Sequence, residues 1–352
     1  MALTRRRTVA LGATTALVLA AGVFGYFAVF PQKAPAFVRT TLETVGLAEE
    51  PPPPPPTCPL TGEEAASGKV PHRPALAIKI ENHPDARPQS SLNQADIVYE
   101  EPVEGGYTRF IAVFHCQGSD RVGPVRSGRL TDPDVLRQFG PAVFGYAGGI
   151  AAVKREVPRA GLVDVNYIVA ADAYVRDTER AAPHDLFTTT AALWRASGSD
   201  AGAPDPVFAY AESYGGKTRR VDGVHLPISS VSDVVWTWSR RDGAWLRAHG
   251  EVAHTLEDGS QVSARTVVIQ VVEVSASQIV DAAGNPSPDV RLTGRGRAYV
   301  LRDGRVIVGR WERSALDEVT RFLTKDGTEI PMAPGRTWVE LLPSAVPVEL
   351  LR

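Results

Sequence analysis

Two arginines and a serine stand directly before a predicted helix, where they could bind an anion. Arg126, Ser127 and Arg129 lie just upstream of a helix start that carries a first-turn proline. Free N–H groups and the helix dipole favour an anion at such a point, and guanidinium groups bind phosphate or carboxylate bidentately. Asp132 and Asp134 add negative charge at the same end. The segment therefore predicts either an anion site or a structural network of ion pairs.

Acidic residues upstream of these arginines could act in acid–base catalysis or bind a divalent cation. Glu100 and Glu104 flank Pro102, and Arg109 follows in the next predicted strand. A positioned carboxyl group can serve as a general acid or base. Strand residues alternate between faces, so the two glutamates share a face only if the strand continues past Pro102. The pattern predicts a catalytic pair or salt bridges to the nearby arginines.

Three further polar residues complete the candidate site. His184 stands beside an aspartate and can act as a base or cap the next helix. Asn82 ends a predicted strand, and Arg87 follows it in a loop. We therefore predict Asn82, Arg87, Arg109, Arg126, Ser127 and Arg129 as ligand-binding residues. Glu100, Glu104 and His184 are the candidate catalytic residues.

The elements that must position these residues change character along the chain. Apolar or alternating runs predict strands over residues 75–81, 96–100, 108–116 and 142–146, with helices near 131–140, 150–157 and 188–196. From about residue 222, five Asp-Gly pairs and β-branched runs predict antiparallel hairpins. The fold class is therefore α+β: a mixed α/β domain over 58–221 and a mostly antiparallel β domain over 222–352.

Five of the six tryptophans lie in the predicted β domain, and they have two interpretations. Trp236, Trp238, Trp245, Trp311 and Trp338 all fall after residue 222. The set could line a carbohydrate platform. Packing in the core and cross-strand pairing is the favoured interpretation.

The amino terminus predicts export. Arg5, Arg6 and Arg7 precede an uncharged stretch over residues 8–30, which would span about 34 Å as a helix. We predict residues 1–30 to form a cytoplasmic tip and a retained single-pass membrane anchor, with the rest of the chain outside the cytoplasm. Cleavage as a signal peptide is the alternative. Residues 31–57 form a proline-rich tether, and outside the cytoplasm Cys58 and Cys116 can form a disulfide.

Composition excludes several classes of protein. The 352 residues are 43% hydrophobic and 22% charged, which suits a globular protein with a real core, and a net charge of −2 argues against a nucleic-acid binder. Walker, Gly-x-Ser-x-Gly, His-Glu-x-x-His and Rossmann signatures are all missing from the sequence. We therefore predict no cofactor and no metal ion, and the sequence identifies no protein partner.

Several of these motifs together resemble the YerB-like family of bacterial envelope lipoproteins. The resemblance covers most of residues 58–345, through the stretches 86–89, 95–100, 104–110, 123–127, 183–184 and 334–338. It implies a two-domain, membrane-associated, extracytoplasmic protein, and it implies no known activity. The chain departs from the family in lacking a lipobox cysteine, for which the predicted anchor substitutes. It also has Asp185 where the family pattern suggests asparagine.

Three functions are compatible with this sequence. The leading hypothesis is a membrane-anchored envelope protein that binds an anionic, phosphate- or carboxylate-bearing envelope ligand through its arginines. The second is an enzyme acting on a phosphorylated or glycan envelope substrate. The third is a scaffold that uses the β domain and the tether to hold other envelope proteins.

Overall fold

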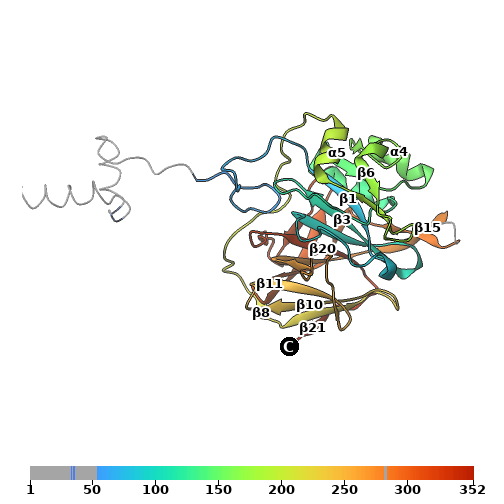
Figure 1. Cartoon of the computed structure of the whole chain (residues 1–352). Helices are drawn as coiled ribbons and strands as arrows, with labels where there is room; N and C mark the ends of the chain where they lie inside the picture. Colours follow the sequence, from blue (N-terminus) through green and yellow to red (C-terminus); the bar gives the residue numbers. More distant parts are fainter. Residues whose placement is uncertain (1–32, 34, 36–53, 281–283) are drawn as a thin grey trace, which may run out of the picture. The chain divides into compact units, whose positions relative to one another are not determined.

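The central sheet combines strands from both halves of the chain. The computed structural model describes residues 33, 35, 54–280 and 284–352, and Pro56–Arg352 form one compact unit (Figure 1). Within these residues the sheet has eleven strands in the order β19-β18-β17-β14-β20-β2-β3-β1-β4-β5, and β8 pairs with β18. The strands are β1 Leu76–Glu81, β2 Ile97–Pro102, β3 Thr108–Phe114, β4 Val143–Gly145, β5 Val163–Asp164, β8 Arg219–Arg220, β14 Thr266–Val272, β17 Gly294–Arg302, β18 Arg305–Arg313, β19 Arg321–Leu323 and β20 Thr337–Pro343.

The other described elements form a second sheet, two hairpins and short helices. The second sheet contains β9 Gly223–Pro227, β10 Asp233–Ser239, β11 Ala244–His249, β12 Val252–Ala253, β13 Ser263–Ala264 and β21 Glu349–Leu351. The hairpins are β6 Tyr174–Arg176 with β7 Leu186–Thr188, and β15 Val274–Val280 with β16 Pro286–Val290. The helices are α3 Thr131–Leu136, α4 Ala151–Arg159, α5 Thr190–Ser197, η2 Pro84–Ala86, η3 Glu104–Gly106, η4 Arg137–Phe139 and η5 Ala171–Ala173.

The order of elements confirms a mixed α/β segment followed by a β-rich one. Every named helix of the described chain lies before residue 198. The prediction of mostly antiparallel pairing in the second segment needs one correction, because β20 runs parallel to both β14 and β2. Parallel neighbours need a long crossover, which β15–β19 supply here. Strand β20 thereby joins the sheet of the first segment, and its hydrogen bonds to β2 connect the two predicted domains. The domain boundary between residues 221 and 222 stays a prediction.

The two faces of the central sheet are covered differently. On one face, Ala77 packs in a core with Val153 of α4. On the other face, Phe110 packs in a core with Trp236 of the second sheet and Leu193 of α5. Figure 1 shows β1, β3 and β20 between the helix α4 and the strands β10, β11 and β21. A strand covered on both faces must be apolar throughout, so a charged residue within it needs a buried partner.

The tryptophans confirm the core interpretation. Trp236, Trp245 and Trp338 are completely buried, and Trp311 is nearly so. Trp238 is half-buried and packs on Trp245, with ring centroids 5.1 Å apart. Four of the five therefore cannot form an exposed carbohydrate platform.

Several Asp-Gly pairs make the turns that the sequence predicts. Asp242-Gly243 joins β10 to β11, and Asp303-Gly304 joins β17 to β18. Asp303 and Gly304 both have positive φ, 54° and 68°, as a two-residue hairpin turn requires. Asp222-Gly223 is different, because it leads into β9 without joining paired strands.

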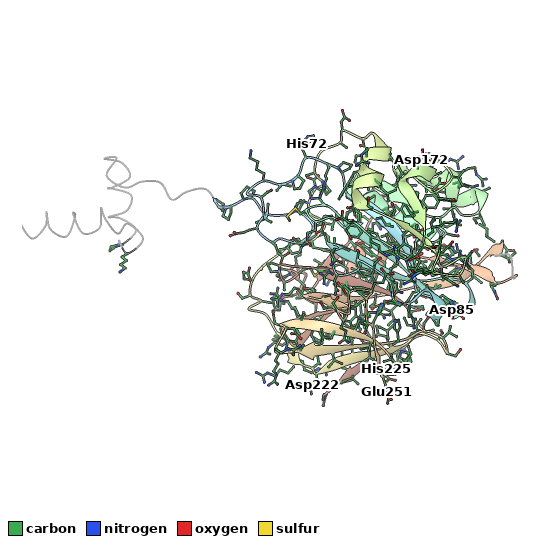
Figure 2. The ribbon with its side chains drawn as sticks, viewed as in Figure 1. His72, Asp85, Asp172, Asp222, His225 and Glu251 are labelled. Atoms are coloured by element: carbon green, nitrogen blue, oxygen red, sulfur yellow. A yellow bond between two sulfur atoms is a disulfide. The ribbon has the colours of Figure 1, made fainter. Side chains whose placement is uncertain are left out.

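The predicted disulfide is confirmed. Cys58 and Cys116 are bonded, with their Cα atoms 6.0 Å apart. Cys116 follows β3, so the bond ties the start of the compact unit to a central strand. Figure 2 shows the side chains over the whole unit, with His225 and Glu251 on the side of the second sheet.

The predicted membrane anchor, residues 8–30, lies outside the described residues, as does most of the tether. Among the residues that the structure describes, no helix has the length and apolar character needed to cross a membrane.

Candidate functional site

Charged residues form a row at one end of the central sheet, on the face that carries α4. β3 lies between β1 and β2, and its register places Arg109 opposite Glu81 of β1 and Glu101 of β2. Lys79 lies two residues before Glu81 and therefore on the same face. The other residues of the site lie around this row of charged side chains.

The segment after β3 returns along the edge of β1 and brings Arg126 to this row. β4 pairs with the first half of β1 only. Beyond that point, the Glu81 N–H donates to the Pro124 carbonyl at 3.0 Å, and the Arg126 N–H donates to the Lys79 carbonyl at 2.9 Å. The Arg126 guanidinium then donates from Nε to Glu81 Oε1 at 2.8 Å. Main-chain hydrogen bonds thus fix Arg126 beside the end of the sheet.

The ion-pair partner of Arg129 is Glu104, which lies outside its own segment. Its Nε donates to Glu104 Oε2 at 2.7 Å, and Ser287 donates to the other carboxylate oxygen. Burial opposes ionisation of Glu104, but the Ser287 hydroxyl and Arg129 outweigh it and lower its pKa. Arg129 and Glu104, with Ser127 and Ser287, line a cavity of about 300 Å³.

Arg109 is the arginine whose charge is not balanced. Its Nη1 donates to the Ser127 carbonyl at 3.0 Å. Among the described residues, no carboxylate lies within ion-pair distance of its guanidinium. Burial, followed by the charges of Arg129 and Arg126, lowers the pKa of Arg109 to about 10, and the charges of Glu81 and Glu104 offset only part of this lowering. We call Arg109, Arg126 and Arg129 the arginine cluster; two of its members are paired, and the third is not.

The acidic residues at the helix start do not neutralise this cluster. Asp132 accepts hydrogen bonds from Lys79 Nζ and from the Arg129 backbone N–H, both at 2.6 Å. Lys79 also pairs with Glu101, whose pKa rises to about 8 because of burial and the adjacent Asp132. Asp132 therefore belongs to a buried triad beneath the arginines and contacts none of their guanidinium groups.

His184 reaches the same site through Glu81. Its Nδ1 lies 2.8 Å from Glu81 Oε2, while Arg126 occupies the other oxygen. The His184 ring stacks on His83, with centroids 5.4 Å apart and an interplanar angle of 13°. Glu81, which the sequence did not single out, is thus the link between an arginine and a histidine pair.

Three predicted site residues lie on the opposite face of the sheet. Asn82 donates to the Thr108 hydroxyl at 2.8 Å, which donates to Glu100 Oε1 at 2.6 Å. Arg87 donates to the Asn82 carbonyl at 2.9 Å, and burial, followed by the charge of Arg247, lowers its pKa to about 10. Glu100 is only 1% exposed. Both of its carboxylate oxygens accept a hydrogen bond from Arg247 Nη2, each at 2.9 Å. Strand β2 ends at Pro102, so Glu100 and Glu104 do not share a face.

The charged residues beside Glu100 come from the second half of the chain, and the sequence analysis missed them. Arg247 is fully buried on β11 and also contacts His254 Nδ1 at 2.9 Å. Glu340 accepts from Trp236 Nε1 at 2.8 Å, and burial beside the Glu100 charge raises its pKa well above the usual range. A glutamate inside the apolar run 338–342 was the available signal, because a charged residue in a buried strand needs a partner.

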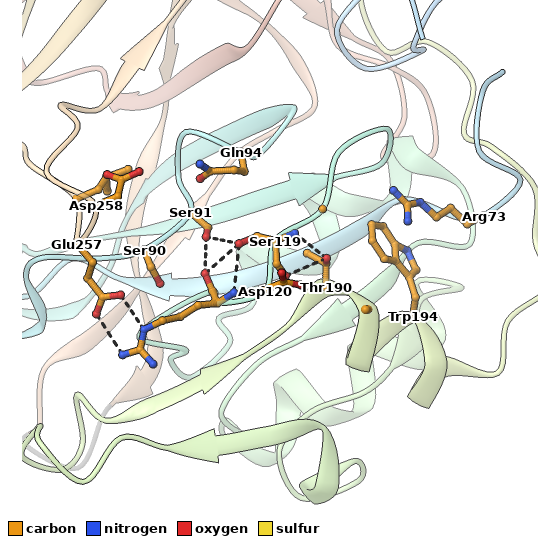
Figure 3. A pocket seen from close by; sticks show the side chains of 14 residues that line it. Arg73, Ser90, Ser91, Gln94, Ser119, Asp120, Thr190, Trp194, Glu257 and Asp258 are labelled. Carbon is orange, nitrogen blue, oxygen red and sulfur yellow. Dashed lines mark hydrogen bonds and ion pairs between the residues drawn. The ribbon is translucent and has the colours of Figure 1, made fainter. Parts of the chain in front are cut away.

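A larger cavity, of about 610 Å³, lies elsewhere on the unit and is rich in hydroxyl groups (Figure 3). Ser91, Ser119 and Thr190 line it together with Arg121. Arg121 is already paired with Asp177 and Glu257, at 2.5 and 2.8 Å. Arg73, Asp120 and Asp258 also line this cavity, so it offers hydroxyl groups together with charges of both signs, whereas the arginine cluster brings three positive charges together.

Comparisons with known proteins agree with the sequence motifs. Two family models match, described as "Protein of unknown function (DUF3048) N-terminal domain" over residues 60–203 and "C-terminal domain" over residues 224–339. A Bacillus subtilis (strain 168) protein named "Putative lipoprotein YerB" is 28% identical over 294 residues, which cover 81% of this chain and 86% of that protein.

A solved structure supports the same relationship. The crystal structure of the YerB protein from Bacillus subtilis superimposes with a TM-score of 0.72 at 26% identity, covering 84% of this chain and 99% of that chain. The family models between them reach from residue 60 to residue 339 of the compact unit. The motifs, the two family models and the shared fold all lead to one assignment: the chain belongs to the YerB-like DUF3048 family.

Proposed function

We propose that this chain is an extracytoplasmic envelope protein whose arginine cluster binds an anionic, phosphate- or carboxylate-bearing ligand. The location is supported by the basic residues 5–7 before the apolar stretch 8–30. A disulfide also suits an oxidising compartment. The name of the relative, a putative lipoprotein, also supports a location at the cell envelope.

The observation that carries the proposal is the unbalanced charge of Arg109. Three guanidinium groups lie close enough for two of them to lower the pKa of the third, yet the described acids pair with only two of them. An oxyanion placed beside Arg109 would relieve this repulsion and could accept bidentate hydrogen bonds. Arg126 is 26% exposed, so a ligand can reach the cluster from solvent.

The geometry favours binding over acid–base catalysis. Glu104, the candidate acid, is held by Arg129 and Ser287, and its lowered pKa keeps it ionised. A general acid works best with a pKa raised toward neutrality. Glu100 is buried in an ion pair on the other face of the sheet. Glu104 therefore serves the site better as a counter-charge than as a proton donor, and Glu100 is the counter-charge of Arg247 outside it.

A thermal-shift series on the purified full-length chain tests the proposal. The probes are phosphate, pyrophosphate, polyprenyl-phosphate analogues and wall glycans, each compared with Arg109→Gln. At 100 times the dissociation constant, a ligand stabilises the folded state by ~2.7 kcal/mol, which is roughly a 4 °C rise for a unit of this size. We expect a saturable rise with at least one anionic probe, and its loss in the variant.

Arg295→Gln is the matched control. Arg295 is an exposed arginine that lines another cavity of about 610 Å³, with Arg291, Arg297 and Arg313. Its variant removes the same charge and should leave the shift unchanged. Loss of the shift in the control but not in Arg109→Gln would move the site to that cavity. No shift with any probe would overturn the proposal.

A further inference from the structure

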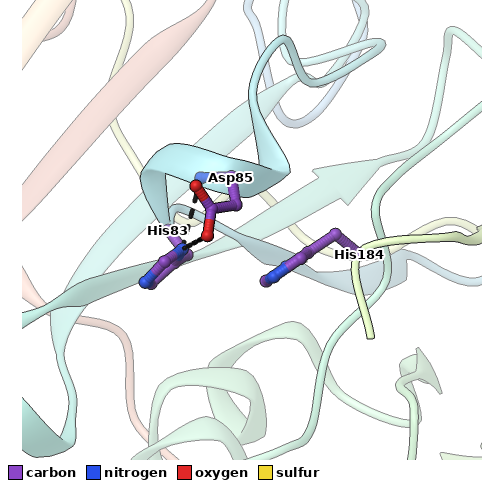
Figure 4. A group of neighbouring side chains, drawn as sticks. All are labelled: His83, Asp85 and His184. Atoms are coloured by element: carbon purple, nitrogen blue, oxygen red, sulfur yellow. Dashed lines mark hydrogen bonds and ion pairs between the residues drawn. The ribbon is translucent and has the colours of Figure 1, made fainter. Parts of the chain in front are cut away.

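Two histidines and an aspartate meet beside the arginine cluster, although they are far apart in the sequence. His83 follows β1, Asp85 lies in η2, and His184 lies in the loop before β7. Each offers one ligand atom, and these atoms all lie within 4.8 Å of one another. Figure 4 shows the His83 and His184 rings side by side, with the Asp85 carboxylate over His83.

The distances suit a metal ion with little rearrangement. His83 Nδ1 and Asp85 Oδ2 are 3.5 Å apart. Two ligand atoms about 2.0–2.1 Å from a tetrahedral zinc ion are separated by roughly 3.3 Å. The His83 Nδ1 lone pair accepts a hydrogen bond from the Asp85 N–H, so a metal ion bound at this nitrogen replaces that bond. The ligand atom of His184 lies within 4.8 Å of the other two.

A carboxylate orients the second histidine as an outer-shell partner does in metal sites. His184 Nδ1 donates to Glu81 Oε2 at 2.8 Å, which leaves the Nε2 lone pair free to bind a metal. Ligating histidines commonly donate their other N–H to such a carboxylate. Glu81 is itself held by Arg126, so that arginine is neutralised and does not repel a cation at His184. The histidine is thus held in the required tautomer from the buried side.

We propose that His83, Asp85 and His184 bind a divalent transition-metal ion of the zinc class, with Glu81 as the hydrogen-bond partner that orients His184. Two imidazole nitrogens and one carboxylate oxygen form a donor set typical of zinc. Three protein ligands leave a coordination position open to solvent. The His83 and His184 side chains are 31% and 14% exposed, so an ion can enter from the surface. The site is independent of the ligand proposed for the arginine cluster.

Calorimetric titration of the full-length, tag-free chain with zinc chloride, after removal of bound metal with a chelator, tests this site. We expect one ion per chain at this site and at least ~10-fold weaker binding in His83→Ala or His184→Ala. Glu81→Gln should weaken binding by ~10-fold, the size of effect usual for an outer-shell partner. Cobalt(II) in place of zinc gives an independent reading, because its visible spectrum should change on binding and lose that change in His184→Ala.

His225→Ala is the matched control. His225 also lies between two carboxylates, Asp233 and Glu349, at 2.6 and 2.8 Å, but among the described residues no second histidine joins them. Unchanged zinc binding in this variant is expected. Absence of binding in the wild type would overturn the proposal, as would equal binding by wild type, His83→Ala and His184→Ala. Circular dichroism confirms that each variant is folded.

Discussion

The buried ion pair between Glu100 and Arg247 should make the two halves of the chain unfold together, and Arg247→Met tests this. The two residues are 147 positions apart, on β2 and β11. Arg247 is fully buried, and its guanidinium is the cationic partner of Glu100. Methionine fills much of the same volume but carries no charge. The variant therefore leaves the Glu100 carboxylate buried with only the neutral donors Thr108 and Asn82.

The expected loss is large because a buried charge without a counter-ion is costly. Removing one partner of a buried pair typically lowers the free energy of unfolding by ~3–5 kcal/mol. The compact unit runs from Pro56 to Arg352. At ~2.1 cal/mol/K per residue, its unfolding entropy is about 0.6 kcal/mol/K, so the loss corresponds to a decrease in Tm of roughly 5–8 °C.

Differential scanning calorimetry and urea unfolding of the full-length oxidised chain measure this loss. We expect one shifted transition for Arg247→Met. Glu100→Gln/Arg247→Met should lose less than the sum of the single variants, since it removes the unpaired charge. Arg241→Met is the control, because Arg241 is 89% exposed and its pair with Asp242 should contribute under ~1 kcal/mol. A loss below ~1 kcal/mol for Arg247→Met, or two transitions of which one is unchanged, would refute the reasoning.

Two further predictions concern stability. The Cys58–Cys116 bond spans a sequence separation of 58, and its reduction should lower the free energy of unfolding by about 4 kcal/mol, because the unfolded chain gains the entropy of the released loop. Urea unfolding with and without reductant measures this loss. Equal stability in the two conditions would contradict the prediction. Burial raises the pKa of Asp96 to about 7 despite its hydrogen bonds from two backbone N–H groups. The folded state therefore binds more protons than the unfolded chain between about pH 4 and 7, and this residue's contribution to stability falls as the pH rises through that window. In urea unfolding, the Asp96→Asn variant should lack up to ~1.4 kcal/mol per pH unit of this dependence of the unfolding free energy on pH. The same pH dependence in the variant and the wild type would show that Asp96 does not titrate as inferred.

Local patterns in the sequence predicted much of the fold. The runs at 75–81 and 108–116 are strands within one or two residues, because apolar alternation reports which residues face a core. Asp303-Gly304 makes its hairpin, because that turn needs two residues that tolerate positive φ. The disulfide could be anticipated because the chain has only two cysteines and a predicted export segment.

The candidate site was predicted only in part. Ser127, Arg129 and Glu104 line one cavity, and Arg126 lies in the same loop; their role in binding stays a prediction. Asn82 and Glu100 were grouped with them, but they lie on the other face of the sheet. The alternation of side chains along a strand is visible in a sequence, whereas the element that covers each face is not.

The sequence by itself therefore determined the secondary structure, the cysteine pair and the residues able to carry charge. Tertiary structure alone decided the partners: Arg247 for Glu100, Glu81 for both Arg126 and His184, and no carboxylate of the described chain for Arg109. It also decided that β20 enters the sheet between β2 and β14. The physical reason is that propensity and turn chemistry act over a few residues, while strand order and buried charge pairing depend on contacts between distant segments, from 45 positions apart for Glu81 and Arg126 to 147 for Glu100 and Arg247.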